Sequence, residues 1–123
     1  MRNNFIEANI FSQKVDTKAE IVIYRTNLIA KMVFSPFAFK SIGSPKRVKV
    51  LLNKNEQAIL IGKNLKGKNF FDIVYCTEFS IFNRNLIGFL IDSMKLPPDQ
   101  NKWHFSNLLF IEENNSKILK IKY

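Results

Sequence analysis

The chain has 123 residues, a length that fits one compact domain. Its 19 lysine and arginine residues outnumber its 10 aspartate and glutamate residues, and the net charge of +9 makes a polyanion such as nucleic acid or an acidic protein surface the expected partner. Its apolar runs reach about five residues, far short of the roughly 20 that cross a membrane, and one cysteine excludes an internal disulfide, so we expect a cytoplasmic protein without a membrane partner.

The N-terminal part of the chain is predicted to contain one bent strand. Residues 1–19 are weakly patterned, and we assign them to an arm or an edge strand. Residues 20–24 alternate isoleucine with smaller or polar residues, which predicts a half-buried strand. A bend near Thr26 separates this strand from its continuation at residues 32–34.

A short helix and a hairpin are expected next. The hydroxyl of Ser35 suits the capping position, and the fixed φ of Pro36 suits the first helical position. The Gly-Ser-Pro sequence at residues 43–45 ends the helix. Residues 47–52 and 57–61 then read as two strands around an Asn-rich turn, and the first of them has one basic face.

The second half repeats this order of elements with a longer helix. Strand character returns at residues 70–75, after a polar connector, and again at residues 77–82. Asn83 opens a helix that runs to Leu96, before Pro97-Pro98. Its apolar residues recur at helical spacing and predict one buried face, namely Leu86, Ile87, Leu90, Ile91 and Met94.

The C-terminal residues are predicted to form a second hairpin. Residues 103–111 and 117–121 have strand character and flank a turn with two glutamates and two asparagines. Alternation along the first of these segments places four apolar residues on the side that we expect to face the core, namely Trp103, Phe105, Leu109 and Ile111.

Two similar halves are therefore expected, at residues 20–63 and 77–122, within one domain of residues 20–123. A unit of a few strands and one short helix cannot cover its own apolar face, so the two halves should interlock. We predict a mainly β (α+β) fold, a small pseudo-two-fold barrel with two short helices.

Positive charge is concentrated in the first half. Residues 40–68 hold eight basic residues and one acidic residue, whereas residues 77–123 hold six basic and five acidic residues. Phosphate contact needs several converging cations, and arginine adds a planar donor fork that favours Arg25 and Arg47 for bidentate contacts. The candidate nucleic-acid-binding residues, expected near one end of the barrel, are Arg25, Lys31, Lys40, Lys46, Arg47, Lys49 and Arg84.

The order of parts in the first half resembles the swapped-hairpin domain of AbrB-like transition-state regulators and MazE-like antitoxins. The resemblance rests on the Ser35-Pro36 helix entry, the helix end at Ile42-Gly43 and the hairpin of residues 48–61. In that family, two copies from separate subunits interlace their hairpins into a small barrel that binds DNA. The resemblance implies two diverged copies in one chain, as a monomer with a pseudo-dimeric core or as a homodimer.

Catalytic motifs are lacking. The sequence contains no Gly-rich phosphate loop, no His-Glu-x-x-His, no Cys-x-x-Cys and no nucleophile elbow, so we expect no enzyme, no cofactor and no metal site. His104 is the single histidine and is expected to be a solvent-facing or hydrogen-bonded strand residue. Cys76 is expected to be buried. The phenylalanine pair Phe70-Phe71 is expected in the core, although exposed phenylalanines would be able to stack on bases.

We therefore predict a small, non-enzymatic DNA-binding regulator of bacterial or phage origin that contacts duplex phosphates through its Lys/Arg face. One alternative is a mobile-element-encoded inhibitor, similar to anti-CRISPR proteins, that binds a host nuclease or its guide RNA, which would give the chain a protein or ribonucleoprotein partner. A third is an antitoxin or a subunit that a partner stabilises.

Overall fold

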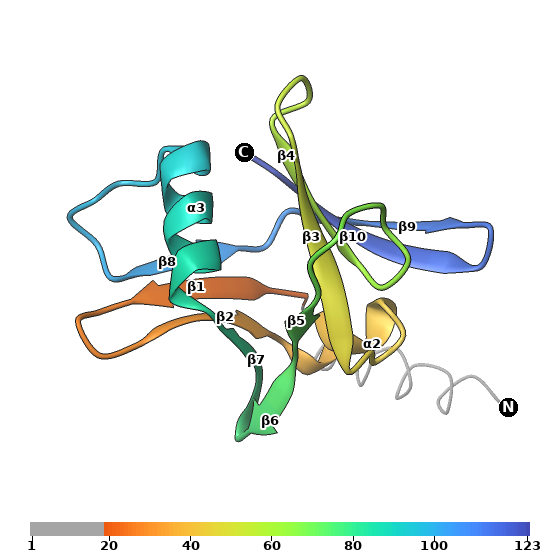
Figure 1. The fold of residues 1–123 in the computed structure, drawn as a ribbon, viewed down its shortest axis with the longest axis horizontal. Helices are drawn as coiled ribbons and strands as arrows, with labels where there is room; N and C mark the ends of the chain where they lie inside the picture. Colours follow the sequence, from red (N-terminus) through yellow and green to blue (C-terminus); the bar gives the residue numbers. More distant parts are fainter. Residues whose placement is uncertain (1–18) are drawn as a thin grey trace, which may run out of the picture.

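A computed structural model describes residues 19–123. The mainly β class with two short helices is confirmed for this part of the chain (Figure 1). The predicted arm or edge strand at residues 1–19 lies outside the described residues except for Ala19. The elements in chain order are β1 (Ile21–Arg25), β2 (Ala30–Phe34), α2 (Pro36–Ser41), β3 (Arg47–Asn53), β4 (Ala58–Gly62), β5 (Phe71–Asp72), β6 (Val74–Cys76), β7 (Glu78–Phe82), α3 (Arg84–Met94), β8 (Lys102–Phe105), β9 (Leu108–Glu113) and β10 (Ser116–Lys122).

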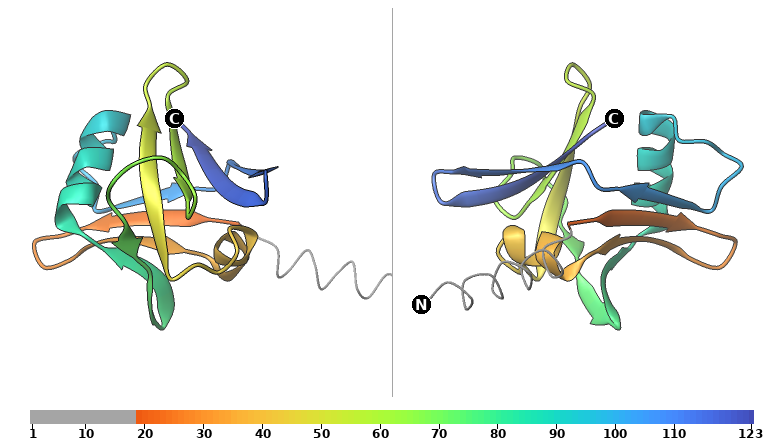
Figure 2. Two further views of the ribbon diagram at one scale, coloured as in Figure 1. Left: turned by 45° about the vertical axis from the view of Figure 1, so that its right-hand side comes forward. Right: turned by 180° about the vertical axis from the view of Figure 1, so that it is seen from behind.

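The strands form two five-stranded antiparallel sheets. The first sheet has the order β6-β7-β2-β1-β8, and the second has the order β5-β3-β4-β10-β9. The chain passes from one sheet to the other three times, between β2 and β3 through α2, between β5 and β6, and between β8 and β9. Figure 2 shows β3 and β4 running across the direction of β1 and β2, so the two sheets enclose the space between them.

Both sheets join the first half of the chain to the second. β2 pairs with β7 in the first sheet, and β4 pairs with β10 in the second sheet. The corresponding strands of the two halves are β1 and β6, β2 and β7, β3 and β9, and β4 and β10. With this correspondence, the four strands β6-β7-β2-β1 and the four strands β3-β4-β10-β9 are each symmetric about their centre, and β8 and β5 are additional edge strands. Each half supplies strands to both sheets, so neither half encloses a core by itself.

The core lies between the sheets and beneath α3. On β1 the inward residues Ile21 and Ile23 are fully buried, and on β4 the same holds for Ile59 and Ile61. The helix α3 packs against β1 and β2, while α2 packs against β2 and β10. The alternation of side chains along each strand explains this division into inner and outer faces.

Both helices begin where the sequence predicts. The Oγ atom of Ser35 accepts a hydrogen bond from the Ala38 N–H at 3.3 Å, and the Oδ1 atom of Asn83 accepts one from the Leu86 N–H at 2.8 Å. All five apolar residues predicted for the inner face of α3 are buried. This helix ends at Met94, two residues earlier than predicted, because Lys95 adopts the left-handed conformation with φ of 54°.

Three strand predictions are wrong in the same way, because the chain turns or changes sheet where the pattern continues. Residues 20–34 form the β1–β2 hairpin, not one bent strand, since Thr26 Oγ1 accepts hydrogen bonds from the Leu28 and Ile29 N–H groups and closes a turn. Residues 70–75 divide into β5 and β6, which belong to different sheets.

The third correction concerns residues 103–111, which divide into β8 and β9. The chain leaves the first sheet after Phe105 and enters the second at Leu108. Trp103 is buried at 5% exposure, but Leu109 is 49% exposed, so the two do not share a core-facing side. Cys76, predicted to be buried, is also exposed.

Candidate nucleic-acid interface

The seven predicted binding residues lie in five places. Arg47 and Lys49 lie on β3, and Arg25 and Arg84 line a cleft beside the β1–β2 turn. Lys31 lies on the outer face of the first sheet. The remaining two, Lys40 in the last turn of α2 and Lys46 just before β3, are exposed. The structure therefore brings four of the predicted cations together in two pairs and does not gather the seven into one cluster.

Lys31 is already engaged by its neighbours. Its Nζ atom lies 3.4 Å from Glu78 Oε1, and its side chain is only 20% exposed. The same ammonium group lies 5.1 Å from the ring centre of Tyr24 and 5.8 Å from that of Phe82. Because a carboxylate and two rings surround this charge, it has little capacity left for a phosphate.

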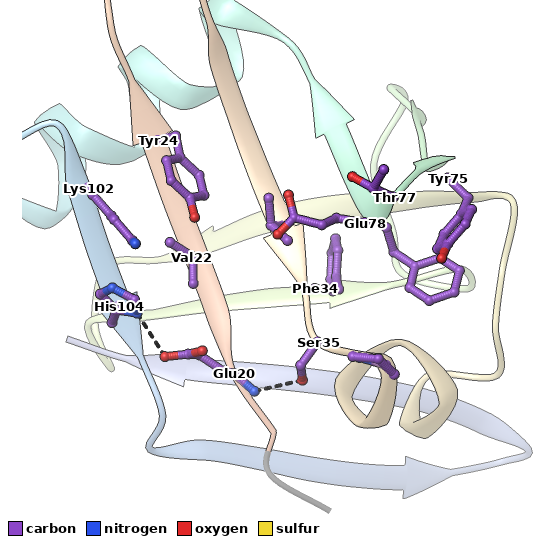
Figure 3. A pocket seen from close by; sticks show the side chains of 13 residues that line it. Glu20, Val22, Tyr24, Phe34, Ser35, Tyr75, Thr77, Glu78, Lys102 and His104 are labelled. Carbon is purple, nitrogen blue, oxygen red and sulfur yellow. Dashed lines mark hydrogen bonds and ion pairs between the residues drawn. The ribbon is translucent and has the colours of Figure 1, made fainter. Parts of the chain in front are cut away.

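A groove of about 590 Å³ lies beside Lys31 on the outer face of the first sheet (Figure 3). Val22 and Val33 lie in its floor. Figure 3 shows His104 directed at Glu20, whose Oε2 atom lies 2.8 Å from His104 Nδ1. His104 is thus both solvent-facing and hydrogen-bonded, as expected. The groove is lined by two carboxylates, Glu20 and Glu78, and by a single lysine, Lys102, so it is a poor site for a polyanion.

In the cleft beside the β1–β2 turn, Arg84 has a structural role. Its guanidinium donates hydrogen bonds to the Thr26 carbonyl at 3.1 Å and to the Asn27 carbonyl at 3.4 Å. These contacts tie the first residue of α3 to the turn. Arg25 lines the same cleft, which is polar and has a volume of about 460 Å³. Arg25 therefore stays available for an anion, whereas part of the Arg84 donor set is already used.

Arg47 and Lys49 are two positions apart on β3, so their side chains share its outer face. Both lie against the ring of Phe70, with the Arg47 Cζ atom 4.8 Å and the Lys49 Nζ atom 4.6 Å from the ring centre. Arg47 Nε also lies 3.6 Å from Asp72 Oδ1, but both side chains are well exposed, at 59% and 79%. An ion pair this open contributes little and is easily exchanged for a phosphate.

The loop between β4 and β5 carries three exposed lysines and approaches this face. Gly67 has φ of +128°, and a Cβ atom placed there would lie 3.1 Å from Leu51 Cδ2 and 4.0 Å from Lys49 Cδ. Glycine therefore permits both the backbone conformation and the close approach of the loop to β3. We call the cations on the outer face of β3 and in this loop, together with the ring beside them, the β3 surface: Arg47, Lys49, Lys63, Lys66, Lys68 and Phe70.

A second groove, of about 570 Å³, runs between the β3 surface and the first turns of α3. Two aromatic rings in it are open to solvent, Phe70 at 41% and Phe89 at 50% exposure. No carboxylate is present among the described residues that line it, which are Lys49, Val50, Leu51, Gly67, Lys68, Asn69, Phe70, Phe71, Asn83, Asn85, Leu86 and Phe89. Cations, open rings and amide groups together suit phosphates, base faces and base edges.

No protein-family model, curated protein or solved structure matches this chain. The resemblance to swapped-hairpin regulators thus remains a prediction. No helix of residues 19–123 is long and apolar enough to cross a membrane. Within the same residues, no group of three or more His, Cys, Asp and Glu side chains is arranged to hold a metal ion.

Sequence reasoning missed part of this site. The predicted binding residues include neither Phe89 nor three lysines of the basic segment 40–68, namely Lys63, Lys66 and Lys68. The available signal was the sequence Lys-Gly-Lys-Asn-Phe at residues 66–70, in which basic residues, a glycine and an aromatic alternate. Such interleaving is typical of surfaces that bind nucleic-acid strands.

Proposed function

We propose that this chain is a non-enzymatic, cytoplasmic DNA-binding regulator whose β3 surface contacts backbone phosphates. The observation that carries the proposal is the concentration of five cations on one strand and its adjoining loop. Within residues 19–123, Arg47 is the only one of these five that lies within ion-pair distance of a carboxylate. A surface with this imbalance attracts polyanions over long distances.

The regulator role is supported by the way in which the two halves combine. The pairing of β4 with β10 joins a hairpin from each half, as the resemblance to swapped-hairpin regulators leads one to expect. Here one chain supplies both hairpins, so a monomer would carry a pseudo-dimeric core. The β3 surface occurs in the first half alone, because the corresponding strand of the second half, β9, carries two glutamates and no lysine.

Salt dependence gives the proposal a magnitude. If each of the five cations meets one phosphate of a duplex, the logarithm of the binding constant should fall with the logarithm of salt concentration with a slope of about −4.5. Raising the salt from about 50 to about 200 mM should then weaken binding roughly 500-fold. Fluorescence anisotropy of a labelled duplex of about 20 base pairs measures this directly.

Two pairs of substitutions localise the contact. Arg47→Glu with Lys49→Glu should abolish measurable duplex binding at about 150 mM salt, because both cations on the outer face of β3 are reversed. Lys95→Glu with Lys122→Glu changes the net charge equally at exposed lysines outside the β3 surface, so it should weaken binding far less. Equal losses of affinity in the two double variants would show that net charge, and not the β3 surface, determines binding. Binding that does not depend on salt would contradict phosphate contact.

A second candidate function is favoured by the exposed apolar residues of two edge strands. On β9, Leu109 and Phe110 are 49% and 39% exposed, and on β6, Val74 and Tyr75 are 48% and 66% exposed. Open edges with apolar side chains can accept a strand from a protein partner. An inhibitor of a host nuclease, similar to anti-CRISPR proteins, would use such an edge. A host protein captured equally well after nuclease treatment of the lysate would favour this candidate over the regulator.

A further inference from the structure

We infer that the groove between the β3 surface and α3 receives an unpaired nucleotide base, which stacks on Phe70, so that the protein prefers single-stranded to fully paired nucleic acid. The inference rests on the proposed nucleic-acid-binding function and adds the form of the substrate. Phosphate contacts alone favour the duplex, whose two strands carry a higher charge density than one strand, so a preference for the single strand requires contacts that only unpaired bases offer.

The position of Phe70 is the first argument. Its ring is 41% exposed, although it stands next to Phe71, which is half-buried against the core. Two cations from β3 lie within 5 Å of the centre of this ring, the guanidinium of Arg47 and the ammonium group of Lys49. A base stacked on this ring would therefore have its own phosphates beside two cations. Stacking and charge act together in this way in proteins that bind single strands.

The opposite wall of the groove supplies the second argument. Phe89 is 50% exposed on α3, whose neighbouring apolar residues Leu86 and Leu90 are buried. It offers a second open ring in the same groove. Asn69 and Asn85, which also line the groove, carry amide groups able to donate to and accept from base edges. The groove thus has partners for the face, the edge and the backbone of a nucleotide.

Base pairing decides whether these partners can be used. In a duplex, the bases stack on one another and their faces are closed to protein side chains, so a ring at the surface adds nothing to phosphate binding. In a single strand, the faces are free. Stacking on one aromatic side chain then strengthens binding by roughly 5- to 150-fold.

The experiment compares three ligands of about 12 units on the full chain by fluorescence anisotropy: a single strand of thymidines, a strand of the same sugars and phosphates without bases, and a duplex. We expect the wild-type protein to bind the thymidine strand at least about 5-fold more tightly than the strand without bases. Phe70→Ala should remove this difference, and Phe70→Trp should keep it. Phe110→Ala, which removes a ring of similar exposure on β9, should leave the difference unchanged.

The outcomes separate the inference from the proposed function. Equal affinity of the wild-type protein for the two single strands, or tighter binding of the duplex than of the thymidine strand, would overturn the inference; with steep salt dependence, either result would leave phosphate binding intact. Absence of binding to any of the three would overturn both. The comparison of strands with and without bases uses the wild-type protein alone, so it stands even if Phe70→Ala fails to fold.

Discussion

Leu119 and Leu109 are separated by ten positions, and their replacement by alanine should have very different consequences for stability. Leu119 on β10 is fully buried and pairs in register with Ile61 of β4, where the two halves of the chain meet. Leu109 on β9 is 49% exposed and pairs with Lys120. The same chemical change is therefore made once inside the core and once at its margin.

The expected magnitudes follow from burial. Leu119→Ala removes a fully enclosed side chain and should lower the free energy of unfolding by about 3 kcal/mol, within the range of 2 to 5 for such sites. For a domain of this size, that loss lowers Tm by roughly 10 to 20 °C. Leu109→Ala should cost about 1 kcal/mol or less, because half of the side chain is already in water.

Urea unfolding followed by tryptophan fluorescence measures both values. Trp103 is the only tryptophan and is 5% exposed, so its emission should shift to longer wavelength on unfolding. A loss at Leu109 that equals the loss at Leu119 would refute this reasoning. It would place Leu109 in the core, as the alternation in the sequence predicted, and would contradict the division of residues 103–111 between two sheets.

Three other predictions address the helix cap, the cleft and the free thiol. Asn83→Ala should destabilise the fold by about 1 kcal/mol through the lost cap on the Leu86 N–H, whereas Asn83→Asp keeps the acceptor; equal losses in urea unfolding would argue against the cap. Arg84→Ala should weaken duplex binding less than about 2-fold, because the guanidinium is used on the Thr26 carbonyl, and a loss above about 10-fold in the anisotropy assay would show direct phosphate contact. Cys76 is exposed and should react with one equivalent of a thiol reagent in the folded protein, so reaction seen only after denaturation would contradict its position at the edge of the first sheet.

Local signals in the sequence were enough to predict the helices. Ser35 and Asn83 act through hydrogen bonds to N–H groups three residues away, and the inner face of α3 follows from a repeat within one helix. These interactions form between residues that are close in the sequence, so the sequence alone predicts them.

The division of the strands between sheets could not be read in the same way. The alternation from Trp103 to Leu109 continues across Ser106 and Asn107, but the chain moves from one sheet to the other there. The same limit applied to the candidate site. Lys31 meets Glu78 from a distant part of the chain, and the loop around Gly67 reaches β3 only through tertiary packing. Charge counts predicted a basic region, and the packing decided which of its cations stay free.

The most direct test of a nucleic-acid interface on the β3 surface is chemical-shift mapping by NMR of the ¹⁵N-labelled protein during titration with an unlabelled oligonucleotide. We predict that the largest changes occur at the amides of β3 and of residues 63–70, and that they disappear at high salt. Changes confined to the groove around Glu20 and His104, or no changes at all, would contradict the account.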